Sequence, residues 1–261
     1  MDGREGTERR KGYWRVVAAS IRGTSHEGNG QLCQDAHHWD MLPEGVLVAA
    51  VADGAGSASL GEIGAEAAAR TAVESIVQRG LPLPEKEDAW GSLLIEALEA
   101  AREAIEVEVI ANEVTERDLA TTLILLVATS EVVAAAQVGD GASVAGDAEG
   151  NIIALTSPQM GEYINQTTFL VSPNALDTAQ LRVWSGAVAH VAVLSDGLQM
   201  LALKMPEGMP HAPFFAPLFR FAAETTKVTE AREQLEAFLC SPRVRERTDD
   251  DLTLLFAALV G

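Results

Sequence analysis

The chain has 261 residues, of which 48% are hydrophobic and 22% charged, so it is long and apolar enough to bury a sizeable core. Its 38 Asp and Glu residues outnumber 19 Lys and Arg, which leaves a formal net charge of −19. Proteins bind nucleic-acid phosphates and anionic membrane surfaces mainly through Lys and Arg. We therefore expect no nucleic acid and no membrane among its partners.

The cysteine content and the first residues indicate a cytoplasmic protein. Cys33 and Cys240 are too few for a disulfide framework, which fits a reducing compartment. The opening residues, MDGREGTERRKG, are charged and lack the apolar segment of a signal peptide. The apolar run near Leu119–Thr129 is too short to span a bilayer. We predict a flexible tail over residues 1–12 and a single domain over residues 13–261.

Hydrophobic patterning predicts strands along the whole chain, with helices between them. Glu62–Gln78 and Ala89–Asn112 carry apolar residues at helical spacing, and Arg22–Leu32, rich in Gly, Ser and Asn, is expected to be a loop. The predicted strands are Tyr13–Ile21, Asp35–Met41, Val46–Ala52, Thr121–Thr129, Val132–Val138, a hairpin over Ala142–Ala154, Ala187–Leu194 and Thr253–Val260. Shorter helices are expected at Leu198–Ala202, Phe214–Glu224 and Glu230–Cys240, and an irregular insert with short strands at Pro158–Ser185.

The order of these elements favours one layered domain. Successive strands joined by hairpin turns favour antiparallel pairing over parallel crossovers. Two long helices, each with one apolar and one polar face, bury their apolar faces by packing against a sheet. The sequence therefore predicts an α+β fold built as a layered sandwich.

Aspartates recur where apolar strands meet loops. Asp53, Asp140 and Asp196 each follow an apolar strand and precede a glycine, and Asp35 and Asp250 stand beside the starts of other strands. One Asp-Gly pair is usually a turn, but three in this setting indicate a shared site. Clustered carboxylates cannot all stay ionised without a cation, and oxygen-rich sets suit Mg²⁺ or Mn²⁺ better than Zn²⁺. Two such ions about 3.5–4 Å apart can share a water and clamp a phosphoryl group.

Six short motifs also follow one another in a recognisable order. They are CQDA (Cys33–Ala36), VADGAGSA (Val51–Ala58), ATTL (Ala120–Leu123), VGDG (Val138–Gly141), LSDGL (Leu194–Leu198) and DDLTLL (Asp250–Leu255). Across Val16–Leu259 this series resembles that of the metal-dependent, type 2C (PPM) serine/threonine protein phosphatases, and GEYINQTTFL (Gly161–Leu170) resembles a segment of a bacterial subgroup. The resemblance implies an αββα sandwich of two central antiparallel sheets flanked by helix pairs, with a dinuclear site at one edge.

The resemblance also implies roles for the aspartates. Asp53 would bridge two Mn²⁺ or Mg²⁺ ions, and the Gly54 carbonyl would bind one of them. Asp196 and Asp250 would hold the other ion.

Two further positions carry weaker assignments. By resemblance, Asp35 would act mainly by orienting metal-bound water, and Asp140 matches a position linked to an additional, weaker metal. Met200 replaces the second Asp of the usual DGxxD motif, which weakens any third-metal site.

The chain departs from the family pattern at three positions. Gln34 replaces an acid, Ala55 replaces a histidine regarded as the general acid for the leaving alkoxide, and Gly30 stands where many relatives carry a phosphate-binding arginine. His26 is a candidate to contact phosphate or donate a proton, with an exposed loop histidine as the alternative. Arg22 is a candidate for a bidentate phosphate contact, with a surface arginine as the alternative.

The function implied by the resemblance is hydrolysis of phosphomonoesters on Ser or Thr of proteins, by a hydroxide bridging two divalent ions. A phosphorylated protein is then the substrate, a cognate kinase is a further candidate partner, and the insert Pro158–Ser185 is the expected specificity surface. The departures from the pattern motivate an alternative, a pseudophosphatase that binds phosphoproteins or regulates them. A calcium-stabilised structural domain is disfavoured because the acids are dispersed along the chain. Cys33 has no nearby base to activate it as a nucleophile.

Overall fold

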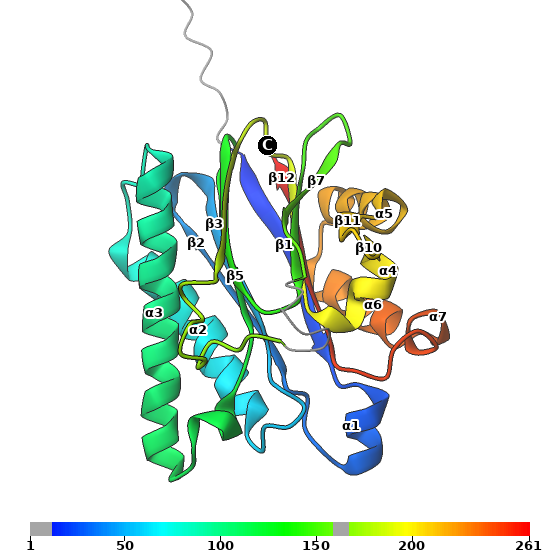
Figure 1. The fold of residues 1–261 in the computed structure, drawn as a ribbon. Coiled ribbons are helices and arrows are strands. Elements are labelled where there is room, and N and C mark those ends of the chain that lie inside the picture. Colours follow the sequence, from blue (N-terminus) through cyan, green and yellow to red (C-terminus); the bar gives the residue numbers. More distant parts are fainter. Residues whose placement is uncertain (1–11, 159–166) are drawn as a thin grey trace, which may run out of the picture.

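The computed structural model describes residues 12–158 and 167–261. Within them, two five-stranded antiparallel sheets pack face to face, and helices cover both outer faces (Figure 1). The predicted α+β sandwich is confirmed. Of the predicted N-terminal tail only Gly12 is described, and residues 159–166 of the predicted insert lie outside the described residues.

Every pairing between neighbouring strands in the two main sheets is antiparallel. The first sheet has the order β1–β12–β9–β6–β7, with bounds Tyr13–Ile21, Leu252–Val260, His190–Leu194, Ala142–Gly146 and Ile152–Thr156. The second has the order β2–β3–β4–β5–β8, with bounds Asp35–Leu42, Val46–Asp53, Leu123–Ala128, Val132–Val138 and Gln180–Ser185. A small hairpin joins β10 (Leu203–Lys204) to β11 (Met209–Pro210).

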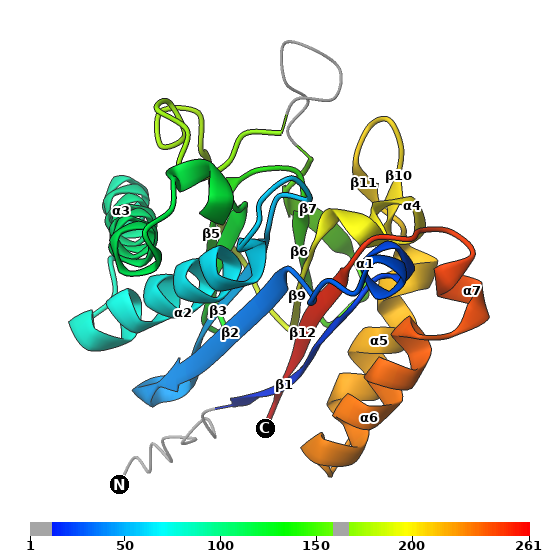
Figure 2. The same ribbon diagram turned by 90° about the horizontal axis from the view of Figure 1, so that it is seen from below.

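The helices divide between the two outer faces (Figure 2). α2 (Gly61–Arg79) and α3 (Glu87–Asn112) cover the second sheet, while α5 (Ala212–Glu224) and α6 (Val228–Leu239) cover the first. The short helices are α1 (Thr24–Asn29), α4 (Gln199–Ala202) and α7 (Pro242–Arg245), with 3-10 turns at Pro43–Gly45, Glu116–Leu119 and Asp196–Leu198. No helix within the described ranges combines the length and apolar character needed to cross a membrane.

The central strands are apolar on both faces because each face is covered. In β3, Leu47 and Val51 point into the layer between the sheets, whereas Val48 and Ala50 pack beneath α2 and α3. This alternation is the two-residue period of a strand, and here both sets of positions are buried. Trp14 fills the same inter-sheet layer and is 1% exposed.

One predicted element is wrong. The segment Arg22–Leu32, expected to be a loop, contains α1 at Thr24–Asn29. A segment of only six residues is too short to form a stable helix alone. The helix is stabilised from a distance, because the Ser25 amide donates to the Asp249 carbonyl at 2.9 Å. Gly30, with φ of +69°, ends it.

Candidate functional site

Strand pairing brings five aspartates to one end of the sandwich. Asp35 opens β2 and lies opposite Asp53, the last residue of β3. In the other sheet the end of β9 pairs with the start of β12, so Asp196 and Asp250 lie just beyond adjacent strand ends. The start of β6 pairs with the same end of β9, which brings Asp140 to this edge as well.

Hydrogen bonds join the two sheets at this edge. The Ser195 hydroxyl, on the residue before Asp196, donates to Oδ2 of Asp35 at 2.7 Å. The Thr253 amide donates to the Ser195 hydroxyl at 2.9 Å. Ser195 therefore holds a carboxylate of the second sheet against the first sheet.

Burial and mutual repulsion resist ionisation of this cluster. Burial raises the pKa of Asp35 to about 8, with further increases from Asp251 and Asp196, although the Ser195 hydrogen bond opposes the shift. Burial also raises the pKa of Asp196 to about 6, and that of Asp53 well above its ordinary value. The Asp53 and Asp196 carboxyl groups lie in hydrogen-bonding contact with each other.

The cluster presents oxygen atoms that the protein does not satisfy. Oδ1 of Asp35 and Oδ1 of Asp196 are buried and have no hydrogen-bond partner in the described structure. Such atoms are costly unless a cation or a bound water contacts them. An all-oxygen donor set of this kind fits a hard divalent cation.

Among the residues that the structure describes, no three His, Cys, Asp or Glu side chains are arranged to hold a metal ion.

The backbone around Asp53 is held closely. The Thr121 hydroxyl and the Thr122 amide both donate to the Asp53 carbonyl, at 2.9 and 2.8 Å. A Cβ on Gly54 would lie 2.7 Å from the backbone of Gly61, so only glycine fits there. The Asp-Gly pair that ends β3 is therefore required by packing as well as by any chemistry.

Asp251 is a site residue that the sequence reasoning missed. It is 2% exposed, and its Oδ2 accepts hydrogen bonds from His26 Nδ1 at 2.8 Å and from the Gln34 amide at 2.5 Å. Its Oδ1 accepts one from the Gly23 amide at 2.6 Å. The run Asp249–Asp251 showed that an acid was present, but only the fold shows which of the three is buried.

The two candidates for phosphate contact differ in their surroundings. His26 lies on α1 and is 8% exposed, so the exposed loop histidine considered as its alternative is wrong. Burial raises the pKa of the Asp250 carboxyl overall, while the backbone hydrogen bond from Asp251 and the charge of the nearby His26 oppose the increase. Arg22 is exposed, and its guanidinium donates to the Gln31 carbonyl at 3.1 Å.

Two of the three positions that depart from the family pattern, Gln34 and Ala55, are buried, whereas Gly30 is exposed. Gln34 donates from Nε2 to the Ala58 carbonyl at 2.9 Å, and its buried Oε1 has no partner in the described ranges. Ala55 packs with Ala58 and Ala120 in a small apolar cluster. Its methyl side chain has no proton to donate. Burial, and next the Asp35 carboxylate, raise the pKa of the Cys33 thiol far above its ordinary value, which makes this cysteine a poor nucleophile.

Asp140 accepts hydrogen bonds through both its side chain and its backbone. The Thr167 hydroxyl donates to its Oδ2 at 2.6 Å, and Gln199 Nε2 donates to its carbonyl at 2.6 Å. Its charge still contributes to the raised pKa of Asp196. Met200, which replaces an acid of the usual motif, is 67% exposed.

The sequence resembles those of known proteins along most of its length. A family model described as "Protein phosphatase 2C" matches residues 22–240. Over 252 residues the chain is 36% identical to Serine/threonine-protein phosphatase 3 of Escherichia coli (strain K12), covering 94% of this chain and 98% of that protein.

Solved structures share the same architecture. Serine/threonine phosphatase Stp1 from Staphylococcus aureus is similar with a TM-score of 0.63 and 16% identity, over 94% of this chain and 95% of that one. RsbX, whose structure is a complex with magnesium, is similar with a TM-score of 0.54 and 15% identity, over 95% and 96% of the two chains. These distant likenesses show a common fold.

Proposed function

Because the chain belongs to the protein phosphatase 2C family and is a metal-dependent protein serine/threonine phosphatase, we propose that the aspartate cluster is its catalytic centre. The observation that carries the proposal is the pair of buried oxygens, Oδ1 of Asp35 and Oδ1 of Asp196, left without a hydrogen-bond partner among the described residues. Buried polar atoms without partners are rare in folded proteins and often mark a bound ion or water.

The same aspartates are the proposed cation ligands. Asp53 and the Gly54 carbonyl, with Asp196 and Asp250, would hold two ions of Mn²⁺ or Mg²⁺, and Asp140 would serve a weaker third. When bound, such ions lower the pKa of water and neutralise charge on a phosphoryl group. The oxygen-only donor set supports these metals over zinc.

Asp35 is proposed to position the water nucleophile. Its Oδ2 is held by the Ser195 hydroxyl, and its buried Oδ1 has no donor among the described residues. An oxygen fixed in this way can accept a hydrogen bond from an attacking water and orient it.

His26 is the proposed proton donor to the leaving alkoxide. Its Nδ1 lies 2.8 Å from Asp251, so the ring is fixed, and its Nε2 has no hydrogen-bond partner in the described part of the chain. A carboxylate that holds one imidazole nitrogen orients the other for proton transfer. Arg22, exposed on the neighbouring turn, is the proposed contact for substrate phosphate.

The proposed setting is cytoplasmic. Cys33 and Cys240 are both free thiols, as a reducing compartment requires. A phosphoprotein presenting phosphoserine or phosphothreonine on a flexible loop is the proposed substrate, and a cognate kinase supplies it. The surface proposed to choose among substrates is the insert Pro158–Ser185, whose last residues form β8.

A phosphopeptide assay with and without Mn²⁺ tests this function. We expect release of phosphate only with the metal, and a loss of at least about a hundredfold in Asp53→Asn, as when an electrostatic catalytic group is removed. Asp177→Asn is the matched control, because Asp177 is an exposed aspartate outside the cluster. Full activity in Asp53→Asn would disprove the assignment.

A further inference from the structure

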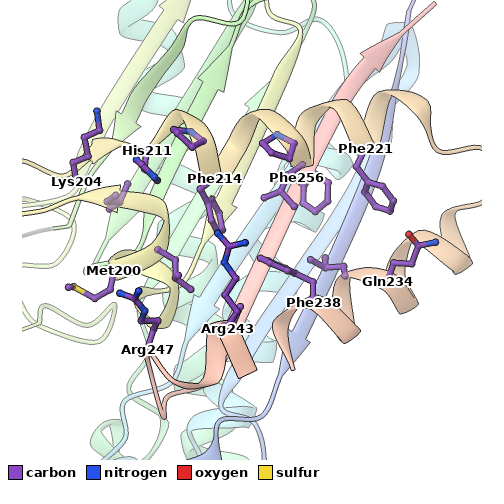
Figure 3. A pocket seen from close by; sticks show the side chains of 17 residues that line it. Met200, Lys204, His211, Phe214, Phe221, Gln234, Phe238, Arg243, Arg247 and Phe256 are labelled. Atoms are coloured by element: carbon purple, nitrogen blue, oxygen red, sulfur yellow. The ribbon is translucent and has the colours of Figure 1, made fainter. Parts of the chain in front are cut away.

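A deep cavity lies on the side of the molecule where helices cover the first sheet. Its volume is about 720 Å³, within the range of small-molecule sites. α5 supplies Phe214 and Phe221 to the wall, α6 supplies Phe238, and Phe256 of β12 lies at the base (Figure 3). The cavity therefore passes between the two helices towards the sheet.

The charge of the cavity is opposite to that of the chain. The whole protein carries a formal charge of −19, yet the 17 residues that line the cavity include Lys204, Arg243 and Arg247 and no Asp or Glu. The side chains of these three residues form no hydrogen bond or ion pair with any described residue. By contrast, Arg245, between the two arginines in sequence, is paired with Glu27 at 2.9 Å.

Two of the cations lie at the end of the cavity away from two of the aromatic rings. Figure 3 shows Lys204 and Arg247 towards one end and Phe221 and Phe256 towards the other, with Arg243 between them. The site thus offers an apolar, ring-lined body and a cationic end. Aromatic walls favour flat rings through offset or edge-to-face packing, and unpaired guanidinium groups favour a carboxylate or phosphate.

We propose that this cavity binds a small amphiphilic anion, an aromatic body carrying one carboxylate or phosphate group. The enclosing walls come from α4, α5, α6 and the residues around α7, which favours a compact ligand over an extended peptide. The site is separate from the aspartate cluster, although Met200 at its edge is only four residues beyond Asp196.

Calorimetric titration with 2-naphthoate tests the proposal, with 2-naphthylmethanol as the neutral probe of similar shape. We expect one binding site for the anion and at least tenfold weaker binding of the alcohol. The double variant Arg243→Gln/Arg247→Gln should weaken naphthoate binding at least tenfold. The matched control, Arg182→Gln/Arg220→Gln, removes two exposed arginines outside the cavity. Its affinity for naphthoate should stay within twofold of the wild-type value.

A second variant tests the cavity itself. Leu218→Trp places a larger side chain on the α5 wall and should abolish naphthoate binding. Thermal unfolding checks that each variant is folded. The titration measures binding alone, so its result does not depend on whether the protein has phosphatase activity. Equal binding of the alcohol, or binding unchanged in a folded Leu218→Trp, overturns the proposal. So does binding only to an acidic peptide or to anionic vesicles.

Discussion

The Nδ1 atom of His26 lies 2.8 Å from Oδ2 of Asp251, a contact between residues 225 positions apart. It ties α1 to the start of β12, and both partners are buried. The same carboxylate accepts hydrogen bonds from the backbone amides of Gly23 and Gln34. Asp251 therefore fixes three segments that border the aspartate cluster. Asp251 is not itself a proposed metal ligand, but it fixes the backbone next to Asp250, which is one.

Removing Asp251 should destabilise the fold strongly. Asp251→Ala leaves two backbone amides and the His26 ring without an acceptor in a buried place, and we expect a loss of about 3 kcal/mol in the free energy of unfolding. Urea unfolding measures it. Asp249→Ala, which removes an exposed carboxylate two residues away, should change stability by less than about 0.5 kcal/mol. Equal effects of the two substitutions would contradict this role.

The effect of substituting His26 on the rate of hydrolysis should depend on the leaving group of the substrate. If His26 donates a proton to the alkoxide, His26→Gln should slow phosphoserine peptide hydrolysis by about a hundredfold. Hydrolysis of p-nitrophenyl phosphate should change little, because its phenolate leaves without a proton. Steady-state kcat for the two substrates measures this. A loss of the same size on both would assign His26 a structural role instead.

Without metal, the protein should become less stable as pH rises from 7 to 9. Burial raises the pKa of Asp35 to about 8 in the folded chain, whereas the unfolded carboxyl titrates near its ordinary value. The unfolded state therefore binds fewer protons in this range, and the free energy of unfolding falls with pH. We expect a fall of about 1–2 kcal/mol, on the scale of one pKa unit.

Unfolding in EDTA at the two pH values measures this fall. Asp35→Asn, which has no proton to lose, should show a smaller change. Mn²⁺ should stabilise the wild type more at pH 9 than at pH 7, because it favours the ionised carboxylates. A stability that rises with pH in EDTA would refute the expectation.

Metal binding should release protons. The pKa values of Asp53 and Asp196 are raised, so a fraction of these carboxyls is protonated before a cation binds. Apparent Mn²⁺ affinity should therefore increase by up to about tenfold per pH unit for each proton released between pH 6 and 7. Calorimetry in two buffers of different ionisation enthalpy counts these protons. A heat of binding that is independent of the buffer would show that the cluster is already ionised.

The layered fold was predictable because its signals are local. The hydrophobic pattern alone predicts apolar strands such as Val132–Val138 and amphipathic helices such as α3. The order of these elements along the chain then leaves few ways for them to pack. α1 was not predictable, because a six-residue helix is too short to be stable alone and is held by contacts with Asp249 and Asp251.

The candidate site divides in the same way. Aspartates at strand ends can be read from the sequence, because a strand end followed by Asp-Gly is a local pattern. The roles of Asp251 and Ser195 depend on which distant donor or acceptor meets them, which only the fold determines. The raised pKa values of Asp53 and Asp196 likewise follow from burial and from three-dimensional proximity.

Two neighbouring glycines give a direct test of the packing behind the cluster. A Cβ on Gly54 would lie 2.7 Å from the backbone of Gly61, whereas a Cβ on Gly56 would meet nothing within 4 Å. We expect Gly54→Ala to lower the free energy of unfolding by about 2–3 kcal/mol, because α2 must shift to make room. Gly56→Ala should change it by less than about 0.5 kcal/mol, since it adds a methyl group to open space. Urea unfolding of both variants measures the difference, and equal stabilities would mean that the end of β3 can move away from α2 without cost.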